Sequence, residues 1–393
     1  MILNNCRLIP ELSGGIAAEC GSVVVENGKI LKVNGAPLTG ADADGQEVID
    51  CEGKTLLPGL IDMHTHITML GNVGIDCVDE PMRILIGAAE QAQKCLKYGF
   101  TTIRDCGSVR AAAVYARDII NKGLVFGPNV LACGETLMSS VVNKNGSLAS
   151  IIHFADGAEE FRKGVREAAG LCVDFIKIYA SGSAYNPTGV PLNPIMTEDE
   201  IRTAVETAQA NGLYVASHCH ADKAIRDCIE CGVKTIEHAT YLSDETINLL
   251  LQTEDCYLIP TLAAMYVSQT DPAEREFWLA RLTPMLENCA GQLEKVYKAG
   301  AKMGFGTDSA PGSVQYEKGV EFQMRKDYCH MENVDILLQA TKYNAEIAGI
   351  HHMVGEIKEG LLADLILVDG NPAEDLSVMY GKPEKVFKSG RLV

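Results

Sequence analysis

The sequence is poor in aromatic residues, in positive charge and in long apolar runs. Aromatic residues make up 6% of its 393 residues, and 34 Lys and Arg against 52 Asp and Glu leave a net charge of −18. A nucleic-acid-binding surface needs a surplus of positive charge, so this deficit argues against a nucleic-acid partner. No apolar run is long enough to span a membrane. The segment Met1–Arg7 lacks the basic region and long apolar core of a signal peptide. We therefore expect neither a nucleic-acid nor a membrane partner.

The 14 cysteines are scattered along the chain rather than clustered. Scattered cysteines are typical of cytosolic proteins, in which they are mostly buried small hydrophobes or free thiols. We therefore expect a cytoplasmic protein. The one Cys-x-x-Cys pair, Cys228 and Cys231, follows a helix-like segment and has no second pair to accompany it. A redox or metal role for this pair is the minor alternative.

The chain length suits a barrel with a small accessory domain better than one ordinary core. From Pro58 onward, short apolar strands alternate with helix-length segments. Eight strands are expected, at Leu60–His66, Thr101–Asp105, Asn129–Gly134, Val173–Ser181, Leu213–His218, Val233–His238, Cys256–Pro260 and Lys302–Asp308. This alternation predicts an α/β protein with a (β/α)8 TIM barrel.

Helix signals separate these strands. Helical segments are expected at Pro81–Tyr98 and Glu159–Ala169. Thr197–Glu200 is a capping box that opens a helix running to about Asn211, with Gly212 as its stop. The stretch Thr136–Phe154 has no sustained period and contains the turn signal Asn145-Gly146, so we expect an irregular loop over the barrel mouth.

Both ends of the chain have the same sequence pattern of short strands separated by turns. Asn27-Gly28 is a hairpin signal near the N-terminus. Near the C-terminus, Ala363–Asp369 is an apolar strand candidate and Lys385–Val393 resembles a hairpin. We expect residues 1–57 and 353–393 to form a small β domain, with the barrel over residues 58–352.

The segment Pro58–His66 is an apolar run that ends in two histidines one residue apart. Alternate residues of a strand share a face, so His64 and His66 present two imidazoles to one side, as at the start of a metal site. An isolated pair of this kind more often simply closes a strand. Further polar residues mark the later strand ends: Lys177, His218, His220, His238 and Asp308.

Each of these residues alone has a structural explanation. A lysine in an apolar strand can form a buried ion pair, a single histidine can lie satisfied in the core, and Asp308 can cap a helix. Active sites of this fold lie at the carboxyl ends of the strands. Because polar residues recur at the carboxyl ends of several strands, the sequence predicts a metal site there.

The set of motifs resembles the amidohydrolase superfamily over nearly the whole chain. The matching features are Gly59–His66, the strand-four lysine Lys177, the histidines of strands five and six, Gly306–Asp308, and Gly355–Asp369 as the return to the small β domain. Within the superfamily, Phe175–Ile178, Thr235–Ala239 and Gly99–Asp105 are most similar to the prolidase-like and imidazolonepropionase-related group.

The resemblance implies a dinuclear metal centre with a carboxylated lysine at Lys177. Carbamate formation needs a neutral amine, and burial among apolar neighbours favours that form. By resemblance, two divalent metals, with zinc the favoured identity, are held by His64, His66 and Asp308 at the first position and His218 and His238 at the second, with Lys177 shared. The implied reaction is hydrolysis by water that the metals activate, with Asp308 passing the proton to the leaving amine.

The substrate is expected to be a small molecule or short peptide, namely a dipeptide or an N-acyl amino acid, as for a metal-dependent dipeptidase. Prolidase-like relatives often have tyrosine where this chain has His220, which we expect to hold the substrate carboxylate; a buried histidine bonded to backbone is the alternative. The loop after strand three lacks the Gly-His pair of that group, since Gly134 is followed by glutamate and His153 is displaced. Dipeptide specificity therefore does not transfer directly.

Three other functions stay open on sequence grounds. An imidazolonepropionase-like enzyme would open a ring at a single metal, where a bridging carbamate at Lys177 has no role. Hydrolysis of another cyclic amide, a urea or a lactone would use the same ligands. A scaffold protein on this fold is expected to have lost ligands, and none is missing. The sequence leaves homo-oligomer formation open.

Overall fold

The computed structural model describes residues 1–39, 45–68, 81–141, 147–184, 193–266 and 271–393. The chain divides into two compact units. The first unit comprises Met1–Asp62, Ala92–Ile103 and Gln315–Val393, and the second comprises Met63–Gln91 and Arg104–Val314. Over the described ranges, no helix is both long enough and apolar enough to cross a membrane.

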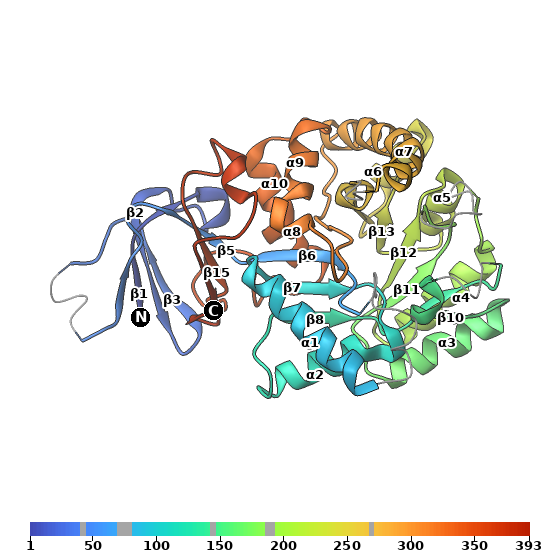
Figure 1. Cartoon of the computed structure of the whole chain (residues 1–393), viewed down its shortest axis with the longest axis horizontal. Helices are drawn as coiled ribbons and strands as arrows, with labels where there is room; N and C mark the ends of the chain where they lie inside the picture. The colour runs from blue at the N-terminus through green and yellow to red at the C-terminus, as the bar shows by residue number, and fades with distance from the viewer. Residues whose placement is uncertain (40–44, 69–80, 142–146, 185–192, 267–270) are drawn as a thin grey trace. The chain divides into compact units, whose positions relative to one another are not determined.

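Figure 1 labels most of the elements along the chain. The strands are β1 (Ile2–Leu8), β2 (Ala18–Glu26), β3 (Lys29–Asn34), β4 (Val48–Asp50), β5 (Thr55–Pro58), β6 (Leu60–Thr65), β7 (Phe100–Asp105), β8 (Asn129–Ala132), β9 (Thr136–Met138), β10 (Ile152–Phe154), β11 (Ile176–Tyr179), β12 (Val215–Cys219), β13 (Thr235–His238), β14 (Tyr257–Ile259), β15 (Leu365–Val368), β16 (Lys385–Lys388) and β17 (Arg391–Leu392). The α-helices are α1 (Pro81–Lys97), α2 (Ala112–Asn121), α3 (Ala158–Gly170), α4 (Glu198–Ala210), α5 (Asp222–Glu230), α6 (Asp244–Gln252), α7 (Pro272–Lys298), α8 (Gln315–Lys318), α9 (Val320–Asp327), α10 (Asn333–Leu338) and α11 (Asn344–Ile347).

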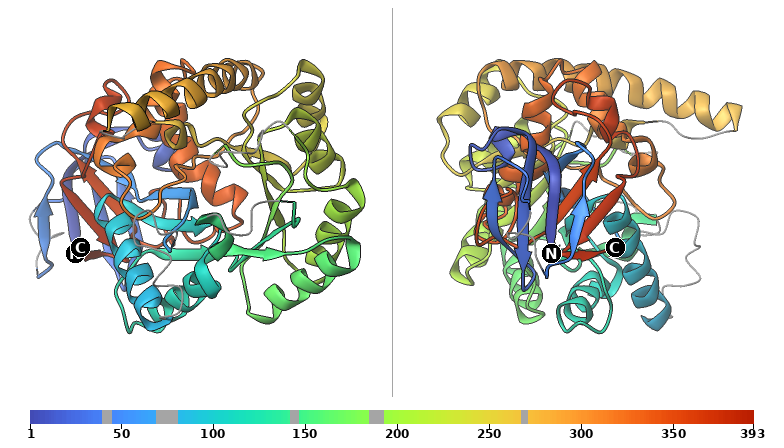
Figure 2. Two further views of the ribbon diagram at one scale, coloured as in Figure 1. Left: turned by 45° about the vertical axis from the view of Figure 1, so that its right-hand side comes forward. Right: turned by 90° about the vertical axis from the view of Figure 1, so that its left-hand side faces the viewer.

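The first unit contains one sheet built from both ends of the chain. Its strand order is β17-β16-β15-β5-β1-β2-β3, with β4 paired to β1. Figure 2 shows the blue N-terminal and red C-terminal strands in this sheet. Asn27 and Gly28, with φ of 51° and 78°, join β2 to β3, as two consecutive positive φ values allow in a tight hairpin turn. Apolar side chains such as Leu3 and Phe387 are fully buried in its core.

The second unit contains a parallel sheet of strand order β10-β9-β11-β12-β13-β14. Its members β11, β12 and β13 are labelled beside one another in Figure 1. A further sheet has the order β6-β7-β8. The two are linked by the hydrogen bond from Asp174 N to Ala132 O, at 2.9 Å. The molecule is therefore an α/β protein with parallel sheets, as predicted.

The predicted eighth strand, Lys302–Asp308, is an extended segment rather than a continuous strand. Met303 forms an isolated parallel bridge with Leu258 of β14, and Ser309 forms one with Thr65 of β6. The segment contains Gly306, where an added Cβ would lie 2.8 Å from the Cβ of His64. A glycine is needed here because the backbone passes so close to His64.

The helix predictions agree with the structure, but one loop prediction is wrong. Thr197 and Glu200 form the predicted capping box of α4. The stretch Thr136–Phe154, expected to be an irregular loop, contains the short strands β9 and β10, although its Asn145-Gly146 signal lies outside the described residues. The sequence pattern could not show these strands, because each is only three residues long and is too short to establish an alternating period.

Candidate metal centre

The predicted site residues all lie in the second unit, at strand ends or directly after them. Six of the seven side chains are buried and one, Asp308, is partly exposed: His64, His66, Lys177, His218, His220, His238 and Asp308. The strands β6, β11, β12 and β13 therefore deliver their polar residues to one region, as expected for the carboxyl ends of parallel strands.

The first predicted ligand set is already assembled. Asp308 Oδ1 lies 3.2 Å from His66 Nε2 and 3.6 Å from His64 Nε2. The ligand atoms of these three residues all lie within 4.8 Å of one another, close enough to converge on one ion. Asp308 has a left-handed backbone, with φ of 56°, and its N–H donates to the carbonyl of His64 at 2.7 Å. This backbone bond helps to place the carboxylate beside the two imidazoles.

The remaining histidines form a second group of close rings. The ring centroids of His218 and His238 are 4.4 Å apart, and His220 lies 4.6 Å from His218 and 5.0 Å from His238. Hydroxyl groups anchor two of the rings, Thr240 at His220 Nδ1 (2.7 Å) and Thr261 at His238 Nδ1 (2.6 Å). These contacts leave Nε2 of both rings for another partner. The two groups meet at His64 and His238, whose centroids are 4.8 Å apart.

Lys177 carries a buried amine that lacks a hydrogen-bond partner among the described residues. It lies on β11, paired in register with Ala216 of β12, and its Nζ is 5.9 Å from the ring of Tyr179. An unsatisfied amine of this kind costs free energy unless another group completes it. A carbamate on Lys177 that binds cations would satisfy this requirement, so the residues present fit a carboxylated lysine and a pair of metals.

Burial keeps most of the histidines neutral. It lowers the pKa of His64, His218 and His238 well below the ordinary value, with neighbouring cationic groups adding to the effect. Burial likewise lowers the pKa of His220 to about 4. For His66, burial also lowers the pKa, but the hydrogen bond and charge of Asp308 outweigh it and raise the pKa. Neutral imidazoles are the form that binds metals.

Three buried residues at the site carried no role in the sequence analysis. Glu237 Oε2 lies 2.7 Å from His64 Nδ1, and Arg104 Nη2 lies 2.6 Å from Glu237 Oε1. Asp105 accepts hydrogen bonds from the backbone N–H groups of Ile67 and Gly107, and burial raises its pKa to about 6. The available signal was a charged residue within an apolar strand, which indicates a buried partner but not its identity.

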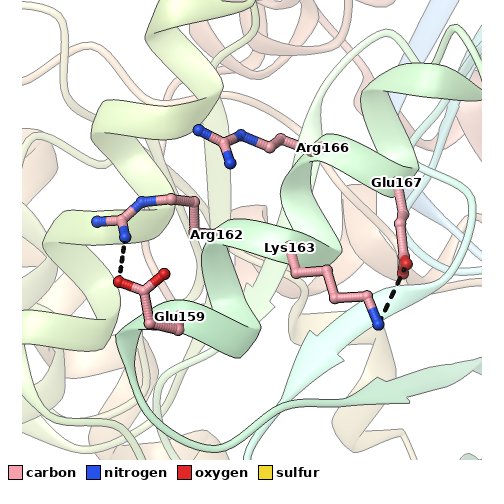
Figure 3. Close-up of a pocket in the computed structure, with 5 residues that line it drawn as sticks. All are labelled: Glu159, Arg162, Lys163, Arg166 and Glu167. Atoms are coloured by element: carbon pink, nitrogen blue, oxygen red, sulfur yellow. Dashed lines mark hydrogen bonds and ion pairs between the residues drawn. The ribbon is translucent and has the colours of Figure 1, made fainter.

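A separate pocket on α3 is not part of this site. It has a volume of about 450 Å³ and is lined by Glu159, Arg162, Lys163, Arg166 and Glu167 (Figure 3). Ion pairs join Arg162 to Glu159 and Lys163 to Glu167 within the helix. Such pairs are typical of a solvent-exposed helix face. None of the predicted site residues lines this pocket.

Comparisons with known proteins identify similar structures and relatives. A prolidase solved with N-methylphosphonate-L-proline is 30% identical, with a TM-score of 0.88 over 100% of this chain and 98% of that one. A Xaa-Pro dipeptidase with bound methionine is 27% identical, with a TM-score of 0.87 over 100% and 99% of the two chains. The ochratoxinase of Aspergillus niger is 26% identical over 368 residues, which cover 86% of this chain and 75% of that protein.

The Amidohydrolase family model matches residues 55–393, a span that includes every predicted metal ligand. The match therefore covers the whole part of the chain in which the predicted ligands lie. This chain is a member of the amidohydrolase family, prolidase-like in structure, and a hydrolase that acts on carbon–nitrogen bonds.

Proposed function

We propose that this protein is a dinuclear metal-dependent hydrolase of the amide bond in a dipeptide or an N-acyl amino acid. The observation that carries the proposal is Lys177, a buried amine without a hydrogen-bond partner among the described residues, on the strand next to that of His218. A carbamate that bridges two metals explains why a lysine stands there. The prolidase and dipeptidase neighbours support the substrate class.

In this proposal the ligands are those expected from the sequence. His64, His66 and Asp308 hold the first metal, His218 and His238 hold the second, and carboxylated Lys177 is shared. Zinc is favoured by the histidine and carboxylate donors. When bound, the metal pair would supply an activated water and polarise the scissile carbonyl.

The side chains of the protein supply proton transfer and orientation. Asp308 is the partly exposed member of the site, with its side chain 13% accessible, so it is placed to accept a proton and return it to the leaving amine. His220 is neutral and anchored through Nδ1 by Thr240. Its Nε2 can donate a hydrogen bond to the substrate carboxylate.

The finer architecture belongs to the same proposal. We propose that the eight predicted strands form a (β/α)8 barrel over residues 58–352, with the small β domain in residues 1–57 and 353–393. The bonds from Asp308 N to His64 O and from Gly304 N to Leu258 O support closure of the barrel by residues 302–308. A cytoplasmic location is proposed from the free thiols among the described cysteines.

The first experiment counts metals and surveys substrates. Zinc-loaded protein is expected to hold two metals per chain and to hydrolyse members of a panel of dipeptides and N-acyl amino acids. One metal with activity only on cyclic amides would instead support an imidazolonepropionase-like enzyme. Activity confined to ureas or lactones would overturn the proposed substrate class, and a protein that binds no metal and hydrolyses nothing would favour a scaffold.

The second experiment tests His220. A hydrogen bond to a carboxylate contributes about 1.5–3 kcal/mol, so His220→Ala should lower kcat/KM for acidic substrates by roughly 10- to 150-fold. The matched substrate is the same compound as its C-terminal amide, which should be affected much less. Equal losses on both forms, or the loss of one metal, would remove His220 from carboxylate binding.

A further inference from the structure

Two buried residues lie beside the predicted metal ligand His64: Glu237 of β13 contacts its ring, and Arg104 of β7 contacts Glu237. We propose that Glu237, held in place by Arg104, positions His64 in the tautomer whose lone pair is on Nε2, the nitrogen that would bind the first metal. This inference rests on the proposed metal centre and adds two positioning residues to it.

Glu237 contacts His64 directly. Glu237 Oε2 lies 2.7 Å from His64 Nδ1, and both side chains are buried, with 0% and 1% exposed. The Glu237 carboxylate, paired with the permanent cation Arg104 through Oε1, accepts the hydrogen bond at Oε2, so the proton of the imidazole lies on Nδ1. The lone pair is then on Nε2, the nitrogen that lies 3.6 Å from Asp308 Oδ1. Glu237 thus turns the ligating nitrogen toward the other members of the first set.

Arg104 contacts both Glu237 and the backbone next to His64. Its Nη2 lies 2.6 Å from Glu237 Oε1, and its Nε donates to the carbonyl of Met63, the residue before His64, at 2.5 Å. Thr235 adds a hydrogen bond from its hydroxyl to Glu237 Oε1 at 2.6 Å and accepts one from Arg104 Nη1 at 3.0 Å. The guanidinium therefore connects the backbone of β6 with the acid that orients the ring of His64.

The position of Arg104 argues against Glu237 as a metal ligand. The ligand atoms of His64, Cys106 and Glu237 also lie within 4.8 Å of one another. Arg104, however, is a permanent cation and already lies against the Glu237 carboxylate. A metal ion at this position would be placed beside a like charge in a fully buried setting, which is unfavourable. The carboxylate is therefore an outer partner of His64.

The test measures zinc affinity by competition with a chromogenic chelator, using zinc alone as the probe. The chain offers a matched control in Glu321 of α9, which is paired with Arg325 at 2.8 Å and equally buried. Glu237→Gln and Glu321→Gln each place an amide beside a buried arginine, so both should lower the Tm. Only Glu237→Gln should weaken zinc binding, by about 10- to 100-fold, as is typical for outer-shell partners. The absorption spectrum of the cobalt-substituted protein should likewise change only in Glu237→Gln.

Unchanged zinc affinity in folded Glu237→Gln would overturn the inference, whereas a wild-type protein that binds no zinc would overturn the proposed function instead. Two further variants keep the test decisive if Glu237→Gln does not fold. Arg104→Gln combined with Glu237→Gln leaves no unpaired buried charge, and Thr235→Val keeps both charges while removing one hydrogen bond to Glu237. Wild-type zinc affinity in either folded variant would also overturn the inference, and weakened binding in both would support it.

Discussion

A buried ion pair in the first unit and the predicted metal site in the second unit contain buried titratable groups in opposite arrangements. In the sheet of the first unit, the one buried pair described here, Lys388 with Asp364, is joined at 2.7 Å with side chains only 8% and 1% exposed. In the second unit, Lys177 has no hydrogen-bond partner among the described residues, and four histidines have a lowered pKa because burial disfavours their charged form. The first arrangement stabilises the fold, while the second costs stability until another group completes it. Substitutions at the ion pair of the first unit should therefore lower stability, whereas substitutions at the site in the second unit should lower function.

The largest effect is expected at Lys177. Lys177→Met should abolish binding of the metal pair and lower activity by more than about 100-fold, above the loss typical of outer-shell partners. Because methionine removes an unsatisfied buried amine, the metal-free variant should be more stable than metal-free wild type by about 1–3 kcal/mol. Metal analysis, kinetic assays and thermal unfolding after chelation measure the three quantities.

A companion variant sharpens the prediction for Lys177. Lys177→Ala leaves space at the site, so added short carboxylic acids should partly restore activity in place of the carbamate. A Lys177 variant that keeps two metals and full turnover would show that the carbamate assignment is wrong.

The next effect concerns Asp308. Asp308→Asn should keep the fold, because asparagine accepts the left-handed backbone at this position, with φ of 56°. Loss of the proton acceptor should lower kcat by roughly 10²–10⁴-fold. Steady-state kinetics at neutral pH provide the measurement, and a near-normal kcat would exclude the proton-transfer role.

The same substitution in the first unit should have the opposite outcome. Asp364→Asn removes the carboxylate that pairs with the buried Lys388 amine, which is expected to cost about 3–5 kcal/mol of unfolding free energy. Metal content and kcat of the folded fraction should match wild type. Urea unfolding measured beside activity tests this, and a selective loss of metal would break the comparison between the two units.

A smaller effect is expected from pH on the metal-free protein. The folded-state pKa of His220 is about 4, below its ordinary 6.5, so the unfolded chain takes up the proton first as the pH falls. Neutral His220 therefore contributes about 3 kcal/mol to the unfolding free energy above about pH 6.5. This contribution is lost as the pH falls toward 4. Urea unfolding of chelated protein at several pH values should show the loss, and His220→Asn should reduce it. An unchanged pH dependence in that variant would contradict the prediction.

Local rules were enough to predict many of the elements and the candidate ligands. Asn27-Gly28 predicts its hairpin because two consecutive residues must accept positive φ, and Thr197 with Glu200 predicts the start of α4 through reciprocal capping bonds. The ligand candidates follow from the alternation of side chains along a strand and from the position of polar residues at strand ends. These signals depend only on residues close in sequence, so the sequence alone carries them.

The partners of those residues were decided by tertiary structure. His64 meets Glu237 across 173 positions of the chain, and no local period relates the two. The short strand β9 depends in the same way on parallel pairing with β11, which follows β10 and α3 in the sequence. The neutrality of His220 and the missing partner of Lys177 result from burial, which is a property of the packed chain. The sequence thus determined which groups are present at the site, and the fold determined how they are oriented, paired and charged.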